Sequence, residues 1–345
     1  MRNSAFLKFA TIVLALAALF QASASAGQKI EIRISACNSM EHPQTLGLLV
    51  MKEYVEKHTQ GNVQVHVFPN SQLGAELESV EQVQMGTLEM ATASIGPIMT
   101  FQEKFSVLDI PFLFDNYLEA WAVLDSGAGT DLLDSLEEAG LYGLAYMENG
   151  YRHTTTNNRP ITKLEDFSGL KIRTMQAPLH IENFKAMKAN PTPIPFSEVY
   201  MALSQRIADG QENPIANIWD LKLAEVQKYT SLTGHIYDAM PLVTNLKWFK
   251  GLPGDYQEII RTGAILGQNY SRFINAGREE MILVKLREQG MQVNELSPEA
   301  KEVIKNAAQP LIADMVRKNI GTEYVDTFLK GIQKVREETA KSVEL

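Results

Sequence analysis

Strand-like and helix-like segments alternate along the first half of the chain, and this alternation restricts the fold more than any other feature. A helix pattern opens at Pro43 and stops at Gly61, and the alternating segment VQVHVFP (63–69) then indicates a strand. The same order recurs with a helix over 76–86 and a strand over 88–94. Because crossover helices cover both faces of the sheet whose strands they connect, the pattern predicts an α/β fold.

The alternation continues to about residue 189. The predicted elements are an extended segment over 108–114, a helical region over 117–139 interrupted near Gly127, a strand over 141–147, a strand over 170–174 and a helix over 179–189. A chain of 345 residues is also more than twice the usual length of a domain. We therefore expect two α/β lobes.

The last third of the chain contains one unusually long helical pattern. Residues 255–289 place apolar side chains close to the helical period. A single helix of this length would extend over about 50 Å and could contact both lobes. The alternative is two helices, broken at one of the glycines Gly263, Gly267 or Gly277. Residues 291–296 then indicate a strand, and Ser297 is a good N-cap for the closing helices.

The N-terminus has the features of a secretory signal peptide. Arg2 and Lys8 precede the apolar run FATIVLALAALF (9–20), and Ala24-Ser25-Ala26 fits the small-residue cleavage rule. We expect a signal peptide over 1–26, with Gly27 as the first mature residue. The residue directly after this site is glycine and not a cysteine that could carry a lipid anchor, and no later run of about 20 apolar residues could span a bilayer.

Charge and cysteine content exclude several classes of function. The formal charge is 32 − 41 = −9, and removal of Arg2 and Lys8 with the signal peptide makes it 30 − 41 = −11. Neither nucleic acid nor an anionic membrane surface is an expected partner, because both require basic patches. Cys37 is the only cysteine, so we expect a small buried side chain and no intrachain disulfide. An anion could then be bound only by local arginines.

Motifs of catalysis are missing from the sequence. There is no GxSxG, HExxH, Walker loop or complete GxGxxG, and the six histidines lack ligand spacing. We therefore expect no cofactor and no metal, and a binding protein rather than an enzyme. An exported hydrolase is the enzyme alternative, and turnover of an ester or glycoside would support it.

Two arginines are the candidates for holding an anion. In LKIRT (170–174), Arg173 lies on the polar face of a strand and near its end. Arg152 follows the strand over 141–147, in a polar segment that includes Thr154 to Thr156, and ligands in open α/β sheets lie beyond such strand ends. ADGQENP (208–214) presents Asn213 on a turn before Pro214. A guanidinium matches a carboxylate bidentately, and an amide can donate beside it, although salt bridges within the protein would explain both arginines equally well.

Six motifs in order resemble those of the solute-binding subunits of TRAP (tripartite ATP-independent periplasmic) transporters, the DctP-type family. They are NSQLGAELESVEQVQMGTLEM, LDIPFLFDNY, GLKIRTM, ANPTPIPFSEVYMAL, DGQENP and EVQKYTSLTGH, and they cover about residues 70–235. The resemblance implies a two-lobed periplasmic binding protein fold, type II-like, with crossing hinge strands and a long helix that spans the lobes. The implied boundaries are 27–149 plus 239–278 for the first lobe and 150–238 plus 279–345 for the second.

The same resemblance implies a set of residues around the solute. Arg173 corresponds to the family's carboxylate-binding arginine and Asn213 to its partner asparagine. The remaining implied contacts are Arg152, Phe196, His235, Glu76, Ser94 and Asn38. Sialic-acid-binding members have an acidic residue where this chain has Ser94, which argues against sialic acid. Trp219 could limit the length of the solute, or it could pack in the core.

The implied function is capture of a small organic acid, a carboxylate, a sugar acid or a sulfonate. The implied partners are the small and large membrane subunits of a permease that works as a symporter. A monomer is the default for such a shuttling receptor. A chemoreceptor of the same fold is the alternative, and neighbouring genes for two membrane subunits would favour transport.

Overall fold

The computed structural model describes residues 29–343, whose strands form a nine-stranded mixed sheet. The strand order is β2-β1-β3-β8-β4-β7-β5-β6, and β9 pairs with β8. The strands are β1 (Ile30–Ser35), β2 (Val63–Phe68), β3 (Met90–Thr92), β4 (Leu141–Thr156), β5 (Lys171–Thr174), β6 (Asn190–Pro193), β7 (Gly210–Pro214), β8 (Tyr229–Asn245) and β9 (Gln292–Glu295). Together with the helices described below, they confirm the predicted α/β class.

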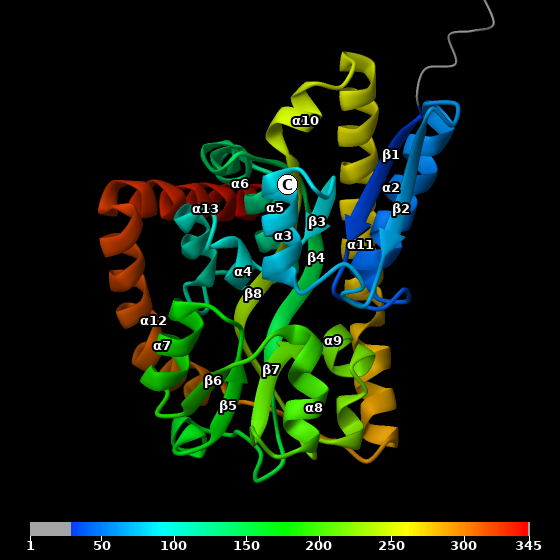
Figure 1. Cartoon of the computed structure of the whole chain (residues 1–345). Coiled ribbons are helices and arrows are strands. Elements are labelled where there is room, and N and C mark those ends of the chain that lie inside the picture. The colour runs from blue at the N-terminus through cyan, green and yellow to red at the C-terminus, as the bar shows by residue number, and fades with distance from the viewer. Residues whose placement is uncertain (1–28, 344–345) are drawn as a thin grey trace, which may run out of the picture.

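Two long antiparallel strands connect the upper and lower parts of the molecule. β4 and β8 contain 16 and 17 residues, and they pair with each other along most of that length (Figure 1). β1, β2 and β3 lie in the upper part of the view, and β5, β6 and β7 lie in the lower part. The prediction of strands that cross between two lobes is therefore confirmed.

The extent of β4 corrects one prediction from the sequence. The strand was expected to end at residue 147, with Arg152 in the loop after it, but β4 continues to Thr156 through two further irregularities in its pairing with β8. Gly150 lies at one of them with φ of +117°, and a Cβ there would lie 2.9 Å from Nδ2 of Asn275. This backbone conformation is easily reached only by glycine. Arg152 thus lies within the crossing strand.

Two further segments differ from the prediction. Residues 210–214 were expected to form a turn but form β7, which pairs with β4 and β5. The extended segment over 108–114 begins inside the 3₁₀ helix η1 (Glu103–Asp109). In both cases the chain is placed by pairing and packing with distant segments, which local sequence patterns do not reveal.

The helices predicted over 43–61, 76–86, 117–139 and 179–189 are present, and the structure adds four short ones, α4, α8, α9 and α10. In chain order, the helices up to residue 250 are α2 (Pro43–His58), α3 (Glu76–Met85), α4 (Ile95–Ile98), α5 (Tyr117–Leu124), α6 (Gly127–Asp134), α7 (Pro178–Ala186), α8 (Val199–Ser204), α9 (Ile215–Asp220) and α10 (Leu246–Lys250). The expected interruption near Gly127 is the junction of α5 and α6. The short 3₁₀ segments are η2 (Ser135–Ala139), η3 (Leu164–Phe167), η4 (Phe196–Glu198) and η5 (Leu223–Glu225).

The long helical pattern forms one continuous helix, α11 (Gly254–Glu288), so the alternative of two broken helices was wrong. α11 contacts α2 and β4 as well as α9 and β9, and it runs along both parts of the molecule (Figure 1). Gly263 and Gly267 serve close packing against α2, whereas a Cβ on Gly277 would meet nothing within 4 Å. A Cβ on Gly47 of α2 would lie 2.4 Å from the carbonyl oxygen of Gly267.

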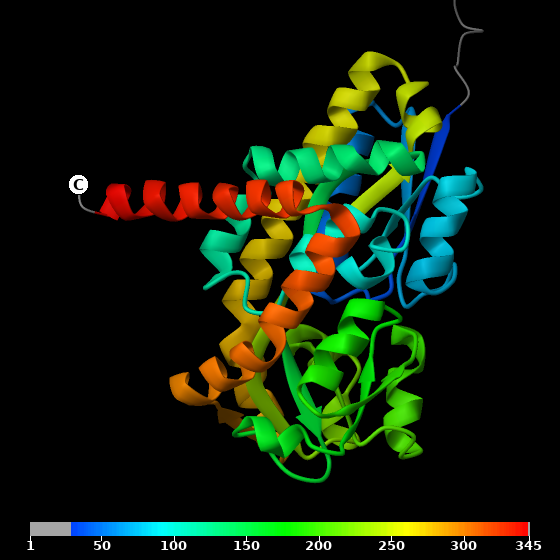
Figure 2. The same ribbon diagram turned by 90° about the vertical axis from the view of Figure 1, so that its left-hand side faces the viewer.

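Two helices close the chain on the side that Figure 2 shows. In α12 (Pro298–Ile320), Oγ of the predicted N-cap Ser297 accepts from the backbone N–H of Ala300 at 3.2 Å. α13 (Thr322–Val343) lies beside α5 and α6 and extends beyond the body of the molecule. Its buried side chains belong to the same hydrophobic cluster as Val123 and Leu132. Within residues 29–343, no helix combines the length and the apolar character of a membrane span.

Candidate functional site

Arg173, on β5, has a buried guanidinium without a carboxylate partner. The residue is 1% exposed, and Nε donates to the carbonyl oxygen of Ile194 at 2.8 Å. Nη1 is buried and has no hydrogen-bond partner within the described chain. Burial lowers the pKa of Arg173 to about 10, although the charge of Glu212 acts in the opposite direction. A buried cation that is not directly paired with a carboxylate is costly.

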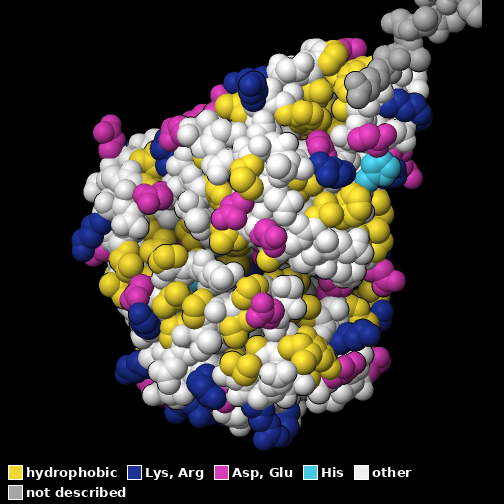
Figure 3. Space-filling view, in the orientation of Figure 1, with side chains coloured by type: hydrophobic (Ala, Val, Ile, Leu, Met, Phe, Trp, Pro, Cys, Tyr) yellow, Lys and Arg dark blue, Asp and Glu magenta, His cyan; other side chains and the backbone are white. Residues whose placement is uncertain are grey.

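The pocket beside Arg173 brings together three of the predicted residues, and a fourth forms a hydrogen bond with one of them. Glu76, at the start of α3, and Phe196, in η4, line this pocket with Arg173, and its cavity volume is about 20 Å³. Oε1 of Glu76 accepts from the backbone N–H of Ser94 at 2.7 Å. Burial raises the pKa of Glu76, and the bond from Ser94 opposes this shift. On the face shown in Figure 3, the surface is hollowed where the upper and lower parts meet.

Asn38 follows β1 and is fully buried near this region. Its Oδ1 accepts from Sγ of Cys37 at 2.6 Å, whereas its Nδ2 is buried without a partner. Cys37 is buried, which confirms the expectation of a small buried side chain, and burial raises the pKa of its thiol. Asn38 does not line the small pocket of Arg173, so its contact with a solute stays a prediction.

Arg152 differs from Arg173 because carboxylates of the protein already surround it. Nε and Nη2 donate to Glu212 at 2.5 and 2.6 Å, and Nη1 donates to Asp238 at 2.6 Å. Burial acts to lower the pKa of Arg152, but these two carboxylates raise it above the usual value. The bonds occupy Nε and Nη2 and one hydrogen of Nη1, so a solute could reach only the second Nη1 hydrogen.

Asn213 and His235 belong to the cluster around Arg152 and Glu212. Oδ1 of Asn213 accepts from Nη2 of Arg152 at 3.3 Å. Nε2 of His235 lies 3.3 Å from Glu212, and its Nδ1 shares a hydrogen bond with Oγ1 of Thr233 at 2.8 Å. Burial lowers the pKa of His235, which favours the neutral ring. Neither residue lines the pocket of Arg173, and their contact with a solute stays a prediction.

Trp219 lies on a different surface. It is half-buried on α9 and lines a wider cleft of about 890 Å³ together with Lys285, whose Nζ lies 5.4 Å from the centre of its ring. Trp219 is not part of the lining of the Arg173 pocket. Its role as a wall that limits the solute therefore stays a prediction.

Sequence reasoning missed the groups that complete the cluster around Arg152. His180 is fully buried, with Nδ1 2.9 Å from Asp109, and its Nε2 lies 3.8 Å from Glu212. Burial acts to lower the pKa of His180, but both carboxylates raise it to about 9. These residues come from distant segments, and only the presence of Glu212 in QENP beside Asn213 could have suggested a counter-ion. Within residues 29–343, no group of three or more His, Cys, Asp or Glu is arranged to hold a metal ion.

The upper and lower parts are also joined by bonds away from the arginines. The carboxylate of Asp220, on α9, accepts from the backbone N–H of Ser39 at 2.9 Å and also from its hydroxyl. His42 shares a hydrogen bond of 2.8 Å with Asn217 of the same helix. The loop after β1 therefore contacts α9 directly, and both sides of the cleft are held together.

The sequence matches one protein-family model and several known proteins over most of its length. A family model described as bacterial extracellular solute-binding protein, family 7 (DctP) matches residues 34–319. The 2,3-diketo-L-gulonate-binding periplasmic protein YiaO of Escherichia coli is 33% identical over 91% of this chain and 95% of its own length. The C4-dicarboxylate-binding periplasmic protein DctP of Rhodobacter capsulatus is 32% identical over 86% of this chain and 90% of its own length.

Solved structures agree with these sequence matches. The sugar acid binding protein DctPAm from Advenella mimigardefordensis, in complex with galactonate, has a TM-score of 0.86 and 34% identity, and the match covers 89% of this chain and 99% of that one. A TRAP periplasmic solute binding protein from Polaromonas, bound to D-erythronate, has a TM-score of 0.83 and 34% identity, covering 87% and 98%. The expected resemblance is thus confirmed, and the chain belongs to the DctP family of bacterial extracellular solute-binding proteins, the family of TRAP solute receptors.

Proposed function

We propose that this chain captures a small organic acid for a TRAP transporter and delivers it to the small and large membrane subunits of the permease. The observation that carries the proposal is the buried Nη1 of Arg173, which has no partner within the described chain. A carboxylate bound there would supply the missing acceptor and the missing counter-charge. Charge-assisted hydrogen bonds of this kind contribute roughly 1.5–3 kcal/mol each.

The solute that we favour is a hydroxylated monocarboxylic acid. Arg173 offers the cationic group, and the carboxylate of Glu76 in the same pocket can accept from a hydroxyl group but would repel a second carboxylate. Relatives with 33–34% identity are described as binding D-erythronate, galactonate and 2,3-diketo-L-gulonate, which are acids of this kind. A sulfonate would satisfy the same guanidinium and is the nearest competitor.

Capture requires the cleft to open and close. The cavity beside Arg173, at about 20 Å³, has room for a water molecule but not for a sugar acid. The bonds from Ser39 to Asp220 and from His42 to Asn217 close the cleft from the side. A solute therefore enters when these bonds part, and binding then selects the closed arrangement because contacts from both lobes form only there.

For the lobes we propose the boundaries expected from the sequence, with one change, which concerns α13. The first lobe comprises 27–149 plus 239–278 and α13, and the second comprises 150–238 plus 279–320. The hydrophobic cluster that joins α13 to α5 and α6 supports placing α13 with the first lobe, although the sequence had suggested the second. β4 and β8 would then act as the hinge between them.

The remaining features follow from the same role. The receptor is exported to the periplasm by the signal peptide over 1–26, which lies outside the described residues, and it acts as a monomer. It binds its solute without chemical conversion. Membership in a family of extracellular solute-binding proteins supports these assignments.

The test is the affinity of the Arg173→Met variant. Truncating one side of a buried charge pair costs about 2–5 kcal/mol. At about 1.4 kcal/mol per tenfold change, the variant should bind at least 30-fold more weakly. Calorimetric titration with D-galactonate, D-erythronate, succinate and isethionate would measure this loss and would rank hydroxy acids against a dicarboxylate and a sulfonate.

The matched control is Arg287→Met, which removes an exposed arginine on α11 that pairs only distantly, at 3.7 Å, with Glu280. It should bind as the wild type does. Undiminished binding of the preferred acid by Arg173→Met would refute the assignment of the anion site. Conversion of the acid during the titration would instead refute a binding role without catalysis.

A further inference from the structure

A histidine at the start of α2 has both ring nitrogens engaged, one on each side of the cleft. His42 is the N-cap of α2 and is 2% exposed. Its Nδ1 accepts from the backbone N–H of Gln44 at 3.2 Å, and its Nε2 lies 2.8 Å from Oδ1 of Asn217 on α9. A backbone N–H can only donate, so Nδ1 carries no proton and the proton of the ring is on Nε2. The two bonds therefore require a neutral ring in one tautomer.

A second proton on the ring of His42 would break this arrangement. Pro43, at the first helical position, has no N–H, so the N–H of Gln44 is the first that α2 presents to a cap. A protonated Nδ1 could not accept from it. The positive ring would also lie at the positive end of the helix dipole. Protonation is thus opposed by the start of α2 as well as by burial.

Charged groups of both signs line the wall around His42, in the wider cleft that Trp219 also lines. The carboxylate of Asp220 is already engaged by the backbone N–H and the hydroxyl of Ser39. The other charged groups of this lining are Glu41 from the same loop, Lys222 and Glu225 after α9, and Arg278 and Lys285 from α11. Burial has the largest effect on the pKa of His42 and lowers it, whereas the charge of Asp220 and the bond to Asn217 act in the opposite direction.

The bond from His42 to Asn217 continues toward a predicted solute contact. Nδ2 of Asn217 donates to Oδ1 of Asn213 at 3.4 Å, and the same oxygen accepts from Nη2 of Arg152 at 3.3 Å. Nδ2 of Asn213 donates to Oε1 of Gln211. His42 is therefore linked, through one side chain, to the amide that we expect to contact the solute.

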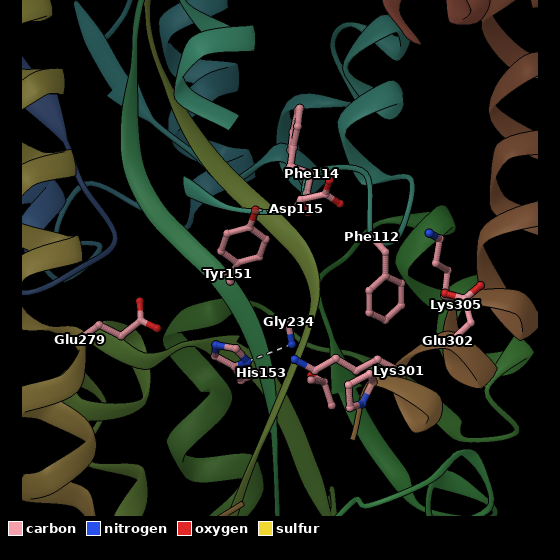
Figure 4. Close-up of a pocket in the computed structure, with 12 residues that line it drawn as sticks. Phe112, Phe114, Asp115, Tyr151, His153, Gly234, Glu279, Lys301, Glu302 and Lys305 are labelled. Carbon is pink, nitrogen blue, oxygen red and sulfur yellow. Dashed lines mark hydrogen bonds between the residues drawn. The ribbon is translucent and has the colours of Figure 1, made fainter. Parts of the chain in front are cut away.

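A second buried histidine, on the crossing strand β4, lacks a bond across the cleft. Nδ1 of His153 accepts from the backbone N–H of Gly234 on β8 at 3.0 Å (Figure 4). Both residues fall within 150–238, the main segment of the second lobe, so opening of the cleft does not separate them. Burial lowers the pKa of His153 to about 3, and we expect this shift in the open and closed arrangements alike. The bond to the opposite lobe distinguishes His42.

We propose that His42 is a positioning residue that links closure of the cleft to pH: its neutral ring joins the loop after β1 to α9 and orients Asn213 through Asn217, and a protonated ring favours the open arrangement. In this proposal, which rests on the proposed function, opening separates His42 from Asn217 and exposes the ring to water. The pKa of His42 then rises toward its ordinary value of 6.5. Because the open form binds the proton more tightly, affinity for the solute falls as the pH falls through 6.5.

Calorimetric titration of D-galactonate at pH 7.5 and 5.5, with the mature wild type and the His42→Asn variant, tests this link. Asparagine is a good N-cap and can accept from Gln44, but it does not titrate, and its shorter side chain gives up the bond to Asn217. At pH 7.5 the variant should bind roughly two- to tenfold more weakly, as expected for the loss of one hydrogen bond.

The decisive quantity is the ratio of the Kd of His42→Asn to the Kd of the wild type. Between pH 7.5 and pH 5.5 this ratio should fall at least about threefold and at most about tenfold, which is the limit for one proton with an ordinary pKa. Other titrating groups are present in both proteins and cancel in the ratio. Proton NMR of the His42 ring provides a second measurement, because reciprocity requires that D-galactonate lower the pKa of His42.

The control is His58→Asn, the same exchange at the exposed end of α2. Its Kd relative to that of the wild type should not vary with pH. A ratio for His42→Asn that is the same at both pH values, or a pKa of His42 that D-galactonate leaves unchanged, overturns the role of His42 in closure. Either result would leave the anion site of Arg173 in place, because that assignment fails only if Arg173→Met binds undiminished.

Discussion

The two buried arginines have opposite environments although only about twenty residues separate them in the chain. Arg152 donates to two carboxylates, and these raise its pKa above the usual value. Arg173 has no carboxylate partner, and burial lowers its pKa to about 10. Both side chains are 1% exposed, so burial alone does not distinguish them.

The difference separates a charge that the protein neutralises by itself from one that it leaves without a carboxylate partner. The protein satisfies Arg152 internally, and this guanidinium fixes Glu212 and Asp238 where β4, β7 and β8 meet. Arg173 is left with an unused hydrogen-bond donor, which is costly in the absence of a ligand and becomes favourable only with a bound anion. Removing the charge of Arg152 should therefore lower the stability of the protein, whereas removing that of Arg173 should weaken the binding of an anion.

The largest expected effect is the loss of stability in Arg152→Met. This substitution leaves the buried carboxylates of Glu212 and Asp238 without their cation, which should lower the free energy of unfolding by about 3–5 kcal/mol. Denaturation in urea would measure the change. Adding Glu212→Gln should recover part of it, and equal stability of the single variant and the wild type would show that Arg152 does not hold the cluster together.

The next largest effect is on the pH dependence of stability, to which His180 contributes through the same cluster. Its pKa of about 9 in the folded protein lies above the ordinary value of 6.5. The resulting stabilisation is therefore complete below pH 6.5 and is lost as the pH rises to about 9. A shift of this size corresponds to about 3 kcal/mol. The wild type should lose this amount relative to His180→Gln across that interval.

Urea denaturation of both proteins at pH 6, 7, 8 and 9 provides the measurement for His180. Other titrating groups, such as Glu148 with its pKa raised by burial to about 7, are present in both proteins and cancel in the difference. If the free energies of unfolding of the two proteins changed in parallel with pH, the result would contradict a protonated His180 in the folded protein.

The smallest expected effect is that of Arg173→Met on the protein without a solute. The substitution removes a buried cation that has no counter-ion and loses one bond, from Nε to Ile194. These two changes oppose each other, so we expect a free energy of unfolding within about 1 kcal/mol of the wild type, or above it. A loss as large as that of Arg152→Met would abolish the contrast between the two arginines.

Much of the fold could be predicted because its signals are local. The helix from Pro43, the strand over 63–68 and the N-cap Ser297 depend on periodicity and capping within a few residues. The predictions failed at segments whose structure depends on contacts with distant parts of the chain. Gly263 and Gly267 of α11 looked like breaks, but they allow α2 to approach closely. The segment over 210–214 became a strand only because β4 and β5 lie on either side of it.

The residues of the candidate site also divide into those that motifs predicted and those that only the fold brings together. Arg173, Glu76, Phe196 and Ser94 were predicted from motifs, and the fold brings these four together. Trp219 lies on another cleft, and the ring of groups around Arg152 was missed because Asp109, His180 and Asp238 come from three separate segments. A sequence motif identifies an arginine but cannot show which carboxylates surround it.

By itself, the sequence determined the class of the protein, its α/β order and the identity of the arginine that we expect to hold an anion, because these depend on residue type and on spacing along the chain. The tertiary structure alone decided which arginine is neutralised within the protein and which has no carboxylate partner. The physical reason is that the energy of a buried charge depends on neighbours in space, which here come from strands and helices far apart in the chain.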